Sequence, residues 1–123
     1  MLRCLIVDDS ERFLAAARTL LEPDGISVIG TASTGEQALR LAAELRPDVL
    51  LVDIDLGGES GLRLAGQLAA QAGTDPIPII LISLHSEEDY AELIAASPAI
   101  GFLPKTALSG SAITETLDGV RGR

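Results

Sequence analysis

Carboxylates follow two apolar runs of this sequence, at positions where they could bind a metal ion. Asp8 and Asp9 come directly after the run 2–7, and Asp53 comes directly after the run 49–52. If both runs are parallel strands of one sheet, their carboxyl ends meet at one edge, and the three side chains lie together. Clustered carboxylates repel one another and raise each other's pKa, so we expect a cation among them. Oxygen ligands alone select a hard ion, with Mg²⁺ preferred to Ca²⁺ or Mn²⁺.

Two further polar residues follow apolar runs in the same way. Ser83 follows the run 79–82, and Lys105 follows the run 99–103. A hydroxyl and an ammonium group at the same sheet edge both suit a phosphoryl group. Each of these residues taken alone is more often structural, since Asp9 or Ser10 could simply cap a helix. Their combination predicts a site that binds a cation and a phosphoryl group.

The elements that must position these residues alternate between two types. Short apolar runs of strand length are separated by segments whose apolar residues recur at helical spacing. Strands separated by helices require parallel crossovers, which predicts an α/β fold with a doubly wound, five-stranded parallel sheet. The expected strands span residues 2–7, 26–30, 49–52, 79–82 and 99–103.

Each expected helix has a start signal or an apolar face. The first spans residues 12–21, the second follows a capping box at 33–36, and the third follows the glycine-rich loop 57–61. The fourth carries acidic residues 87–89 in its first turn, where the helix dipole favours them. The apolar positions expected to face the core in the third and fifth helices are Leu62, Ala65, Leu68, Ala69, Ile113, Leu117 and Val120.

Composition excludes several classes of protein. Nine basic and eighteen acidic residues give a net charge of −9, which argues against direct nucleic-acid binding by this chain. The single cysteine, Cys4, excludes an internal disulfide and fits a reducing cytoplasm. With one histidine, His85, most zinc sites and Ser-His-Asp schemes are also excluded. The apolar runs are far shorter than the ~20 residues needed to span a bilayer, so we expect a cytoplasmic protein of one domain, 1–123.

The order of these motifs resembles the receiver domains of bacterial response regulators over nearly the whole chain. The resemblance is carried by L-I-V-D-D at 5–9, V-L-L-V-D-I-D-L-G-G-E-S-G at 49–61, L-I-S at 81–83 and G-F-L-P-K at 101–105. The chain is similar to chemotaxis regulators, and G-F-L-P-K-T-A-L at 101–108 is similar to receivers that precede LuxR-type DNA-binding domains. The resemblance implies a flavodoxin-like sheet of strand order 2-1-3-4-5.

The same resemblance implies roles for the acidic residues. Asp53 corresponds to the phosphoacceptor, whose carboxylate attacks a phosphohistidine of a partner kinase. Asp9 corresponds to a direct Mg²⁺ ligand and Asp8 to one that acts mostly through water. The backbone carbonyl of Asp55 is expected to complete the protein's share of the coordination.

Lys105, Ser83 and Phe102 complete the implied machinery. Lys105 corresponds to the lysine that pairs with the phosphate. Ser83 corresponds to the switch hydroxyl, and Phe102 to the switch aromatic whose rotamer follows the hydroxyl. The implied partners are a sensor histidine kinase or phosphotransfer protein, and a downstream protein that binds the face formed by the fourth helix, fifth strand and fifth helix. A homodimer linked to phosphorylation is also expected, and neither nucleic acid nor a membrane is an expected direct partner.

Some positions depart from the common receiver pattern. Gly57 stands where proline is frequent, which predicts a more mobile loop, and Leu84 stands where a small residue is usual and could narrow access to the phosphoryl group. Asp55 and His85 occupy positions that tune phosphate lifetime in the family. They could form an acid–imidazole pair across the mouth of the site, or His85 could be a solvated loop residue.

Other functions remain open at this stage. D-I-D at 53–55 also resembles the motif of haloacid-dehalogenase-type phosphatases, but there the motif follows the first strand and Asp8 and Asp9 would have no role. A receiver-like module that is never phosphorylated usually lacks one of the acids or the lysine, and this sequence has them all. For output, we expect a stand-alone receiver that signals by protein contacts, with the excised receiver of a LuxR-type transcription factor as the alternative. We expect no enzymatic turnover beyond self-phosphorylation and autodephosphorylation.

Overall fold

Strands and helices alternate along the whole described chain. The computed structural model describes residues 1–121, with side chains to residue 119, and contains five strands and five α-helices within that range. The strands are β1 (Leu2–Val7), β2 (Ile26–Ala32), β3 (Val49–Asp53), β4 (Ile79–Ser83) and β5 (Gly101–Pro104). The helices are α1 (Glu11–Leu21), α2 (Gly35–Leu45), α3 (Gly61–Ala72), α4 (Ala91–Ala95) and α5 (Gly110–Arg121). Single 3₁₀ turns follow α1 (η1, Glu22–Asp24), precede α4 (η2, Glu87–Tyr90) and follow β5 (η3, Lys105–Ala107).

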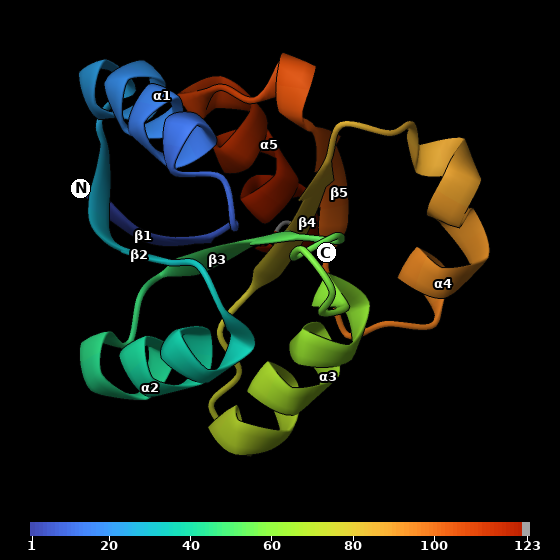
Figure 1. Cartoon of the computed structure of the whole chain (residues 1–123). Coiled ribbons are helices and arrows are strands. Elements are labelled where there is room, and N and C mark those ends of the chain that lie inside the picture. Colours follow the sequence, from blue (N-terminus) through green and yellow to red (C-terminus); the bar gives the residue numbers. More distant parts are fainter. Residues whose placement is uncertain (122–123) are drawn as a thin grey trace.

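The five strands form one parallel sheet in the order β2-β1-β3-β4-β5, which confirms the expected doubly wound topology. In Figure 1, α1 and α5 lie on one side of this sheet and α2 and α3 lie on the other. Because all strands run in the same direction, their carboxyl ends share one edge. The loops that follow β1, β3, β4 and β5 therefore meet there.

The core has two layers that share the central strands. Alternate residues of β1 point to opposite faces, so Cys4 and Ile6 pack with α1 and α5, whereas Leu5 and Val7 pack with α2 and α3. Every residue of β3 and β4 is buried. Continuous apolar runs are what a parallel strand covered on both faces requires, so the central strands hold the site edge on a rigid base.

The start of α2 differs from the expected capping box. Thr34, rather than Ser33, is the N-cap, and its hydroxyl accepts the Gln37 backbone N–H at 3.2 Å. Gln37 Oε1 in turn accepts the Ser33 backbone N–H at 2.9 Å. The cap therefore lies one residue later than predicted, and Gln37 returns its bond to Ser33, the residue before the N-cap, because glutamine can accept such a bond as well as glutamate.

The segment between β4 and β5 also differs from the expectation of one helix. The acidic residues 87–89 lie in η2, and α4 follows with five residues, all exposed or half-buried. Figure 1 shows this segment standing out from the side of the molecule. β5 begins at Gly101, two residues later than predicted. Few apolar side chains anchor this segment, so sequence periodicity gave little information about its bounds.

Helices α3 and α5 place their apolar faces largely as expected. Ile113 and Leu117 of α5 are buried, whereas the side chain of Val120 lies outside the described residues. In α3, Ala65 and Leu68 are buried with Leu64, which the spacing argument did not include. Leu62 and Ala69, which it did include, are half-buried at the margins of this face.

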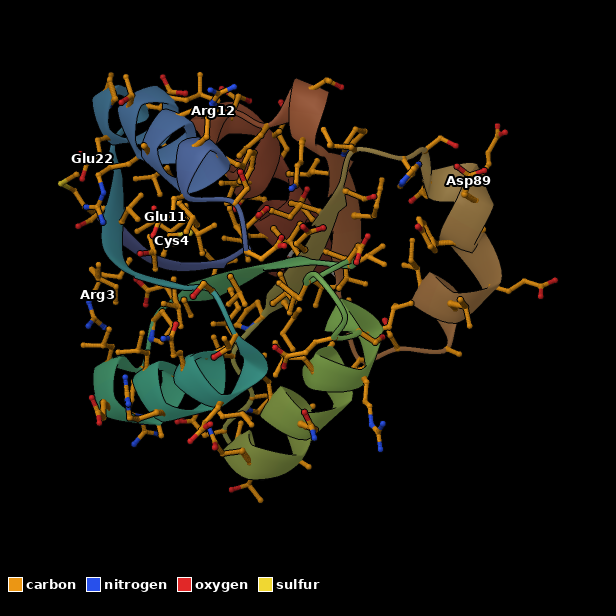
Figure 2. The ribbon with its side chains drawn as sticks, viewed as in Figure 1. Arg3, Cys4, Glu11, Arg12, Glu22 and Asp89 are labelled. Atoms are coloured by element: carbon orange, nitrogen blue, oxygen red, sulfur yellow. The ribbon has the colours of Figure 1, made fainter. Side chains whose placement is uncertain are left out.

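The only cysteine lies inside the fold, away from the surface charges of Arg3, Glu22 and Asp89. Figure 2 shows Cys4 between the sheet and α1, with Arg3, Glu22 and Asp89 at the periphery. The Cys4 thiol is completely buried, and burial raises its pKa to about 12. Among the described helices, none combines the length and the hydropathy needed to cross a membrane.

Candidate functional site

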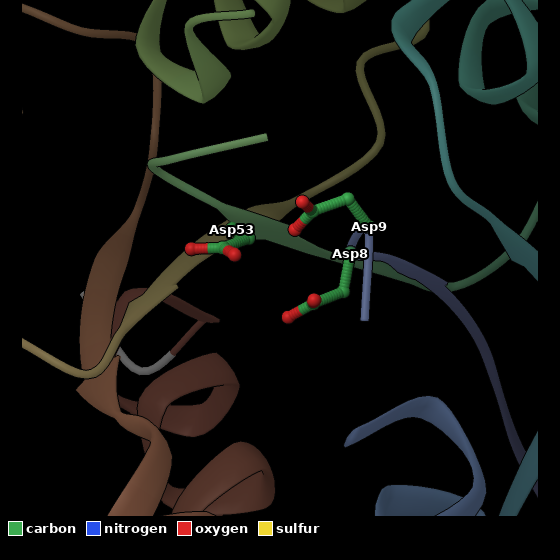
Figure 3. Close-up of side chains that lie close together, drawn as sticks. All are labelled: Asp8, Asp9 and Asp53. Atoms are coloured by element: carbon green, nitrogen blue, oxygen red, sulfur yellow. The ribbon is translucent and has the colours of Figure 1, made fainter. Parts of the chain in front are cut away.

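Three carboxylates meet at the carboxyl edge of the sheet, as the sequence predicts. Asp8 and Asp9 follow β1, and Asp53 is the last residue of β3, the strand next to β1. Each offers one oxygen atom, and these three atoms lie within 4.8 Å of one another. Figure 3 shows the side chains converging from the two strand ends. This arrangement follows from the register, which pairs Val7 with Val52 just before the acids.

Burial makes this cluster electrostatically unfavourable. Asp8 is completely buried and Asp53 is 5% exposed, whereas Asp9 is exposed. Burial and, to a lesser extent, the negative charge of Asp8 raise the pKa of the Asp53 carboxyl to about 6. The Asp55 backbone N–H, which donates to Asp53 Oδ1 at 3.2 Å, and the ammonium of Lys105 act in the opposite direction. A carboxyl with a pKa near 6 is still mostly ionised at neutral pH.

Lys105 brings positive charge into the cluster. It is the first residue of η3, directly after β5, and its Nζ lies 3.1 Å from Asp53 Oδ2 and 2.5 Å from Asp8 Oδ2. Burial acts to lower the pKa of Lys105, but the contacts with Asp8 and Asp53 outweigh burial and raise it above its ordinary value. The ammonium therefore stays charged and binds two carboxylates at once.

Phe13 is a part of the site that sequence reasoning missed. Lys105 Nζ lies 4.4 Å from the centroid of the Phe13 ring, in cation–π geometry. Phe13 belongs to the first turns of α1, where its helical spacing suggested only core packing. The one available signal was that Phe13 is among only three aromatic residues and follows Asp9 by four positions. The ring forms an apolar wall for the ammonium.

The carboxylate cluster fits a hard cation. Asp8 Oδ2 is buried and, within residues 1–121, accepts no hydrogen bond of normal geometry, although it forms the ion pair with Lys105. Asp8 Oδ1, by contrast, accepts the Ser10 backbone N–H at 2.8 Å. One ammonium cannot neutralise three carboxylates, and oxygen-only ligand sets prefer Mg²⁺ or similar ions. The donor set and the uncompensated charge are therefore both suited to a divalent cation.

The loop 54–60 closes one side of the site at very short range. Gly57 and Gly58 have positive φ angles of 59° and 105°, which glycine adopts without strain. A Cβ atom on Gly57 would lie 2.5 Å from Asp9 Oδ2, so the loop backbone packs directly on this carboxylate. The Asp55 side chain is exposed and is not part of the carboxylate cluster.

Ser83 and Phe102 lie on the neighbouring strands. Ser83, the buried last residue of β4, directly follows Ile82, which pairs with Asp53 across the sheet. Its Oγ accepts the His85 backbone N–H at 3.0 Å. Phe102 pairs with Leu81 and packs half-buried against the layer formed with α2 and α3.

The two residues after Ser83 are exposed. The His85 ring is exposed and meets the edge of Tyr90 at a centroid distance of 6.2 Å, and no hydrogen bond or ion pair joins it to Asp55 among the described residues. Leu84 is 75% exposed and, with Phe13, Leu20 and Lys105, lines a shallow apolar hollow beside the site. The solvated-loop interpretation of His85 thus agrees with its position better than the acid–imidazole pair does.

Comparisons with known proteins identify what this chain resembles. A family model described as "Response regulator receiver domain" matches residues 4–118. The transcriptional regulatory protein LiaR of Bacillus subtilis (strain 168) is 37% identical over 98% of this chain and 55% of that protein. Response regulator UvrY of Escherichia coli (strain K12) is 33% identical over 98% of this chain and 53% of that protein.

A solved structure gives the same result for the fold. The chemotaxis protein CheY4 of Vibrio cholerae aligns with a TM-score of 0.81 and 26% identity, over 98% of both chains. The chain spans about half the length of the curated relatives that it matches.

Proposed function

Because this chain belongs to the response regulator receiver domain family, we propose that Asp53 accepts a phosphoryl group from a phosphohistidine. The observation that carries the proposal is Lys105 Nζ, held between Asp8 Oδ2 at 2.5 Å and Asp53 Oδ2 at 3.1 Å. This geometry keeps a fixed positive charge beside the oxygen that would attack. The family match also favours a receiver over the phosphatase alternative.

The proposed reaction follows the ordinary balance of phosphoryl transfer. An Asp53 carboxylate oxygen forms a bond to phosphorus while the bond between phosphorus and the donor imidazole nitrogen breaks. The imidazole keeps that electron pair and takes a proton from water. Asp53 attacks as the ionised carboxylate, which dominates above its pKa of about 6. Lys105 pairs with the transferred oxygens, so placement and charge supply most of the rate.

Mg²⁺ is the proposed cofactor, held by carboxylate oxygens of Asp9, Asp8 and Asp53 and by the backbone carbonyl of Asp55. Asp9 and Asp53 would bind it directly and Asp8 mostly through water. When bound, Mg²⁺ supplies positive charge that offsets the carboxylates and the incoming phosphoryl oxygens. The chain's own contribution is to keep these oxygens together at the sheet edge despite their repulsion.

The proposed switch uses Ser83 and Phe102. Phosphorylation adds close to two negative charges, by analogy with other phosphorylated side chains. Ser83 Oγ would leave the His85 N–H to donate its own hydrogen to the phosphoryl group, and Phe102 would move into the space released. Support comes from the position of Ser83 on β4, the strand next to Asp53, and from the half-buried ring of Phe102 on β5, the strand that pairs with β4.

The proposed partners act at two places. A sensor kinase or phosphotransfer protein would deliver its histidine at the mouth of the site, where the apolar hollow bordered by Leu84 and Phe13 offers a contact surface. The signal would leave through α4, β5 and α5, where Leu93 is 58% exposed. A net charge of −9 favours a protein target or a second copy of the chain over direct contact with nucleic acid.

The output remains a choice between two proposals. A stand-alone receiver would act through these protein contacts in the cytoplasm. The alternative, a receiver taken from a LuxR-type transcription factor, is favoured by the printed function of LiaR and by the length of the relatives. Neither proposal includes enzymatic turnover, because one Asp53 is labelled once in each cycle.

Intact mass spectrometry after incubation with acetyl phosphate and Mg²⁺ tests the central proposal. We expect wild type to gain the mass of one phosphoryl group and Asp53→Ala to gain none. Lys105→Met should retain Mg²⁺ binding and lose most of the labelling rate. A wild-type protein that gains no mass with any divalent ion would contradict the proposal, and multiple turnovers of a phosphate ester would favour the phosphatase.

A further inference from the structure

The loop 54–60, between β3 and α3, is anchored at its start by the buried side chains of Ile54 and Leu56, and a glycine pair separates these from Glu59. It contains Gly57 and Gly58, both with positive φ, and lacks the proline that would stiffen it. Backbone hydrogen bonds close the turn: the Leu56 N–H donates to the Glu59 carbonyl at 3.0 Å, the Glu59 N–H donates to the Leu56 carbonyl at 3.5 Å, and the Gly61 N–H donates to the Ile54 carbonyl at 2.7 Å. Glycine can adopt many backbone conformations, so an anchor directly after the glycine pair restricts the turn at 57–58.

Glu59 supplies that anchor by reaching across to α2. Its Oε1 accepts the backbone N–H of Gly35 at 3.1 Å, across 24 residues of sequence. Gly35 is the first residue of α2, so the carboxylate satisfies a free N–H and lies at the positive end of an eleven-residue helix. This hydrogen bond therefore joins the loop 54–60 to α2, an element outside the site.

Gly35 is the residue that makes room for this contact. A Cβ atom on Gly35 would lie 2.8 Å from Glu59 Oε1 and 3.5 Å from Leu64 Cδ1. An alanine would therefore displace the carboxylate, although the conformation of Gly35 itself is open to any residue. The two residues form a complementary pair, one supplying the acceptor and the other supplying the space.

We propose that Glu59 is a positioning residue of the metal site, which acts by fixing the loop 54–60 against α2. The loop carries Asp55, whose carbonyl is a proposed ligand, and packs Gly57 against the Asp9 carboxylate. If the loop moves, both ligands lose their fixed position relative to Asp53. This inference rests on the proposed function, because it assigns Glu59 a role toward the same Mg²⁺.

Three variants separate position from charge. Glu59→Ala removes both the acceptor and the charge, and Glu59→Gln removes the charge but keeps Oε1 as an acceptor. Gly35→Ala keeps the charge, displaces the carboxylate, and places a better helix former in α2. Glu59 is exposed, so its variants are expected to fold.

Asp24→Ala is a matched control elsewhere in the molecule. Asp24 Oδ2 accepts the backbone N–H of Gly110, the first residue of α5, at 2.9 Å. Like the contact between Glu59 and Gly35, this one joins a carboxylate to the first N–H of a helix that begins with glycine. Asp24 does not belong to the carboxylate cluster, so this variant loses a cap without touching the site.

Mg²⁺ titration of the thermal midpoint, with the full chain and no phosphodonor, measures apparent Mg²⁺ affinity directly. We expect Glu59→Ala and Gly35→Ala each to weaken the apparent Mg²⁺ affinity about fivefold, which is the ratio that corresponds to the loss of one helix cap. Hydrogen exchange at 54–60 should be faster in both. Glu59→Gln should stay within about twofold of wild type, and Asp24→Ala should lower the midpoint without changing the affinity. With acetyl phosphate, the Mg²⁺ concentration for half-maximal labelling should shift, and the rate at saturating Mg²⁺ should not.

Several outcomes would overturn the inference. If wild type binds Mg²⁺ while Glu59→Ala and Gly35→Ala bind it equally well, Glu59 has no positioning role. If Glu59→Gln binds Mg²⁺ as weakly as Glu59→Ala does, while Gly35→Ala binds it as tightly as wild type, the Glu59 charge acts on Mg²⁺ at a distance and not through the position of the loop. A wild type that binds no Mg²⁺ and gains no phosphoryl group would instead remove the proposed function itself.

Discussion

At the scale of single residues, the site contains more negative charge than its own positive charge can balance. Asp8 and Asp53 share the one ammonium of Lys105, and Asp9 adds a third carboxylate at the surface. Burial of the Asp53 carboxyl, together with the neighbouring charge of Asp8, raises its pKa to about 6. Such a site is less stable when its acids are ionised and no cation is bound.

Asp53→Asn should therefore stabilise the metal-free protein at neutral pH. The folded-state pKa of about 6 lies above the ordinary value of 3.8, so the folded state binds the proton more tightly than the unfolded chain. This stabilising contribution is complete below pH 3.8 and is lost as the pH rises through 6. At pH 7 we expect the variant to be about 1–3 kcal/mol more stable than wild type.

Urea unfolding at several pH values, without divalent ions, measures this difference. The difference in free energy of unfolding between Asp53→Asn and wild type should grow from pH 4 to pH 6.5 and then stay constant. Mg²⁺ should stabilise wild type more than the variant. A variant that is less stable than wild type at pH 7, or a gap independent of pH, would contradict the assigned pKa.

Phe13 is expected to stabilise the Lys105 ammonium. The ring lies 4.4 Å from Nζ, and the lysine side chain is only 8% exposed. A double-mutant cycle of Phe13→Leu and Lys105→Met should give a coupling of about 1 kcal/mol. The loss of apolar packing caused by Phe13→Leu cancels in the cycle, because it occurs both with Lys105 present and in the Lys105→Met background. A coupling indistinguishable from zero would reduce Phe13 to a packing residue.

At the scale of elements, the start of α3 fixes how closely this helix approaches Asp53. A Cβ atom on Gly61 would overlap the Asp53 backbone carbonyl, whereas Gly66, in the same helix, has open space around it. Gly61 has no positive φ, so close approach alone requires glycine there.

Alanine at these two positions should have opposite effects. Gly61→Ala should lower the free energy of unfolding by about 2 kcal/mol or more and abolish labelling of Asp53, because the backbone has to shift. Gly66→Ala should raise the free energy of unfolding by about 0.5–1 kcal/mol and leave labelling unchanged. Chemical denaturation and intact mass check both, and equal effects of the two substitutions would contradict the contact with Asp53.

The sequence predicted the elements well where apolar periodicity is strong. The runs of β3 and β4 and the faces of α1 and α5 needed only their spacing to be recognised. The prediction was wrong where packing is sparse. The acidic residues 87–89, expected in the first turn of the fourth helix, precede α4, in which Ile94 is half-buried and the other four residues are exposed. At α2, the N-cap lies one residue later than predicted, because the pair Thr34 and Gln37 fits the capping pattern as well as the pair Ser33 and Glu36 does.

The site shows the same division. Asp8, Asp9, Asp53 and Lys105 could be placed together because each directly follows a strand of one parallel sheet. Phe13 and Glu59 could not, since their contacts depend on how far α1 and the loop 54–60 reach across the edge. Local spacing contains no information on such distances between elements.

At the scale of the whole molecule, both apolar layers depend on one sheet. β1, β3 and β4 contribute side chains to each layer, so neither layer can lose its packing alone. We therefore expect the chain to behave as one domain and to unfold in a single cooperative transition. Leu21→Ala in one layer and Leu64→Ala in the other should each shift the whole transition.

Far-ultraviolet circular dichroism and Tyr90 fluorescence, followed through the same urea titration, test this expectation. Tyr90 reports on the layer with α2 and α3, and circular dichroism reports on the whole backbone. The two curves should coincide for wild type and for both variants. Separated midpoints in either variant would indicate that the layers unfold independently.

The buried Cys4 thiol makes the opening of the central strands measurable. Its thiol is completely buried in β1, between β2 and β3, and its pKa of about 12 leaves almost no reactive thiolate at neutral pH. An alkylating reagent can therefore modify the chain only during the moments when the central strands separate. Because the sequence contains no second cysteine, the alkylation rate of Cys4 measures the rate at which the central strands open. This rate gives the lifetime of the native state from a residue that is otherwise unreactive.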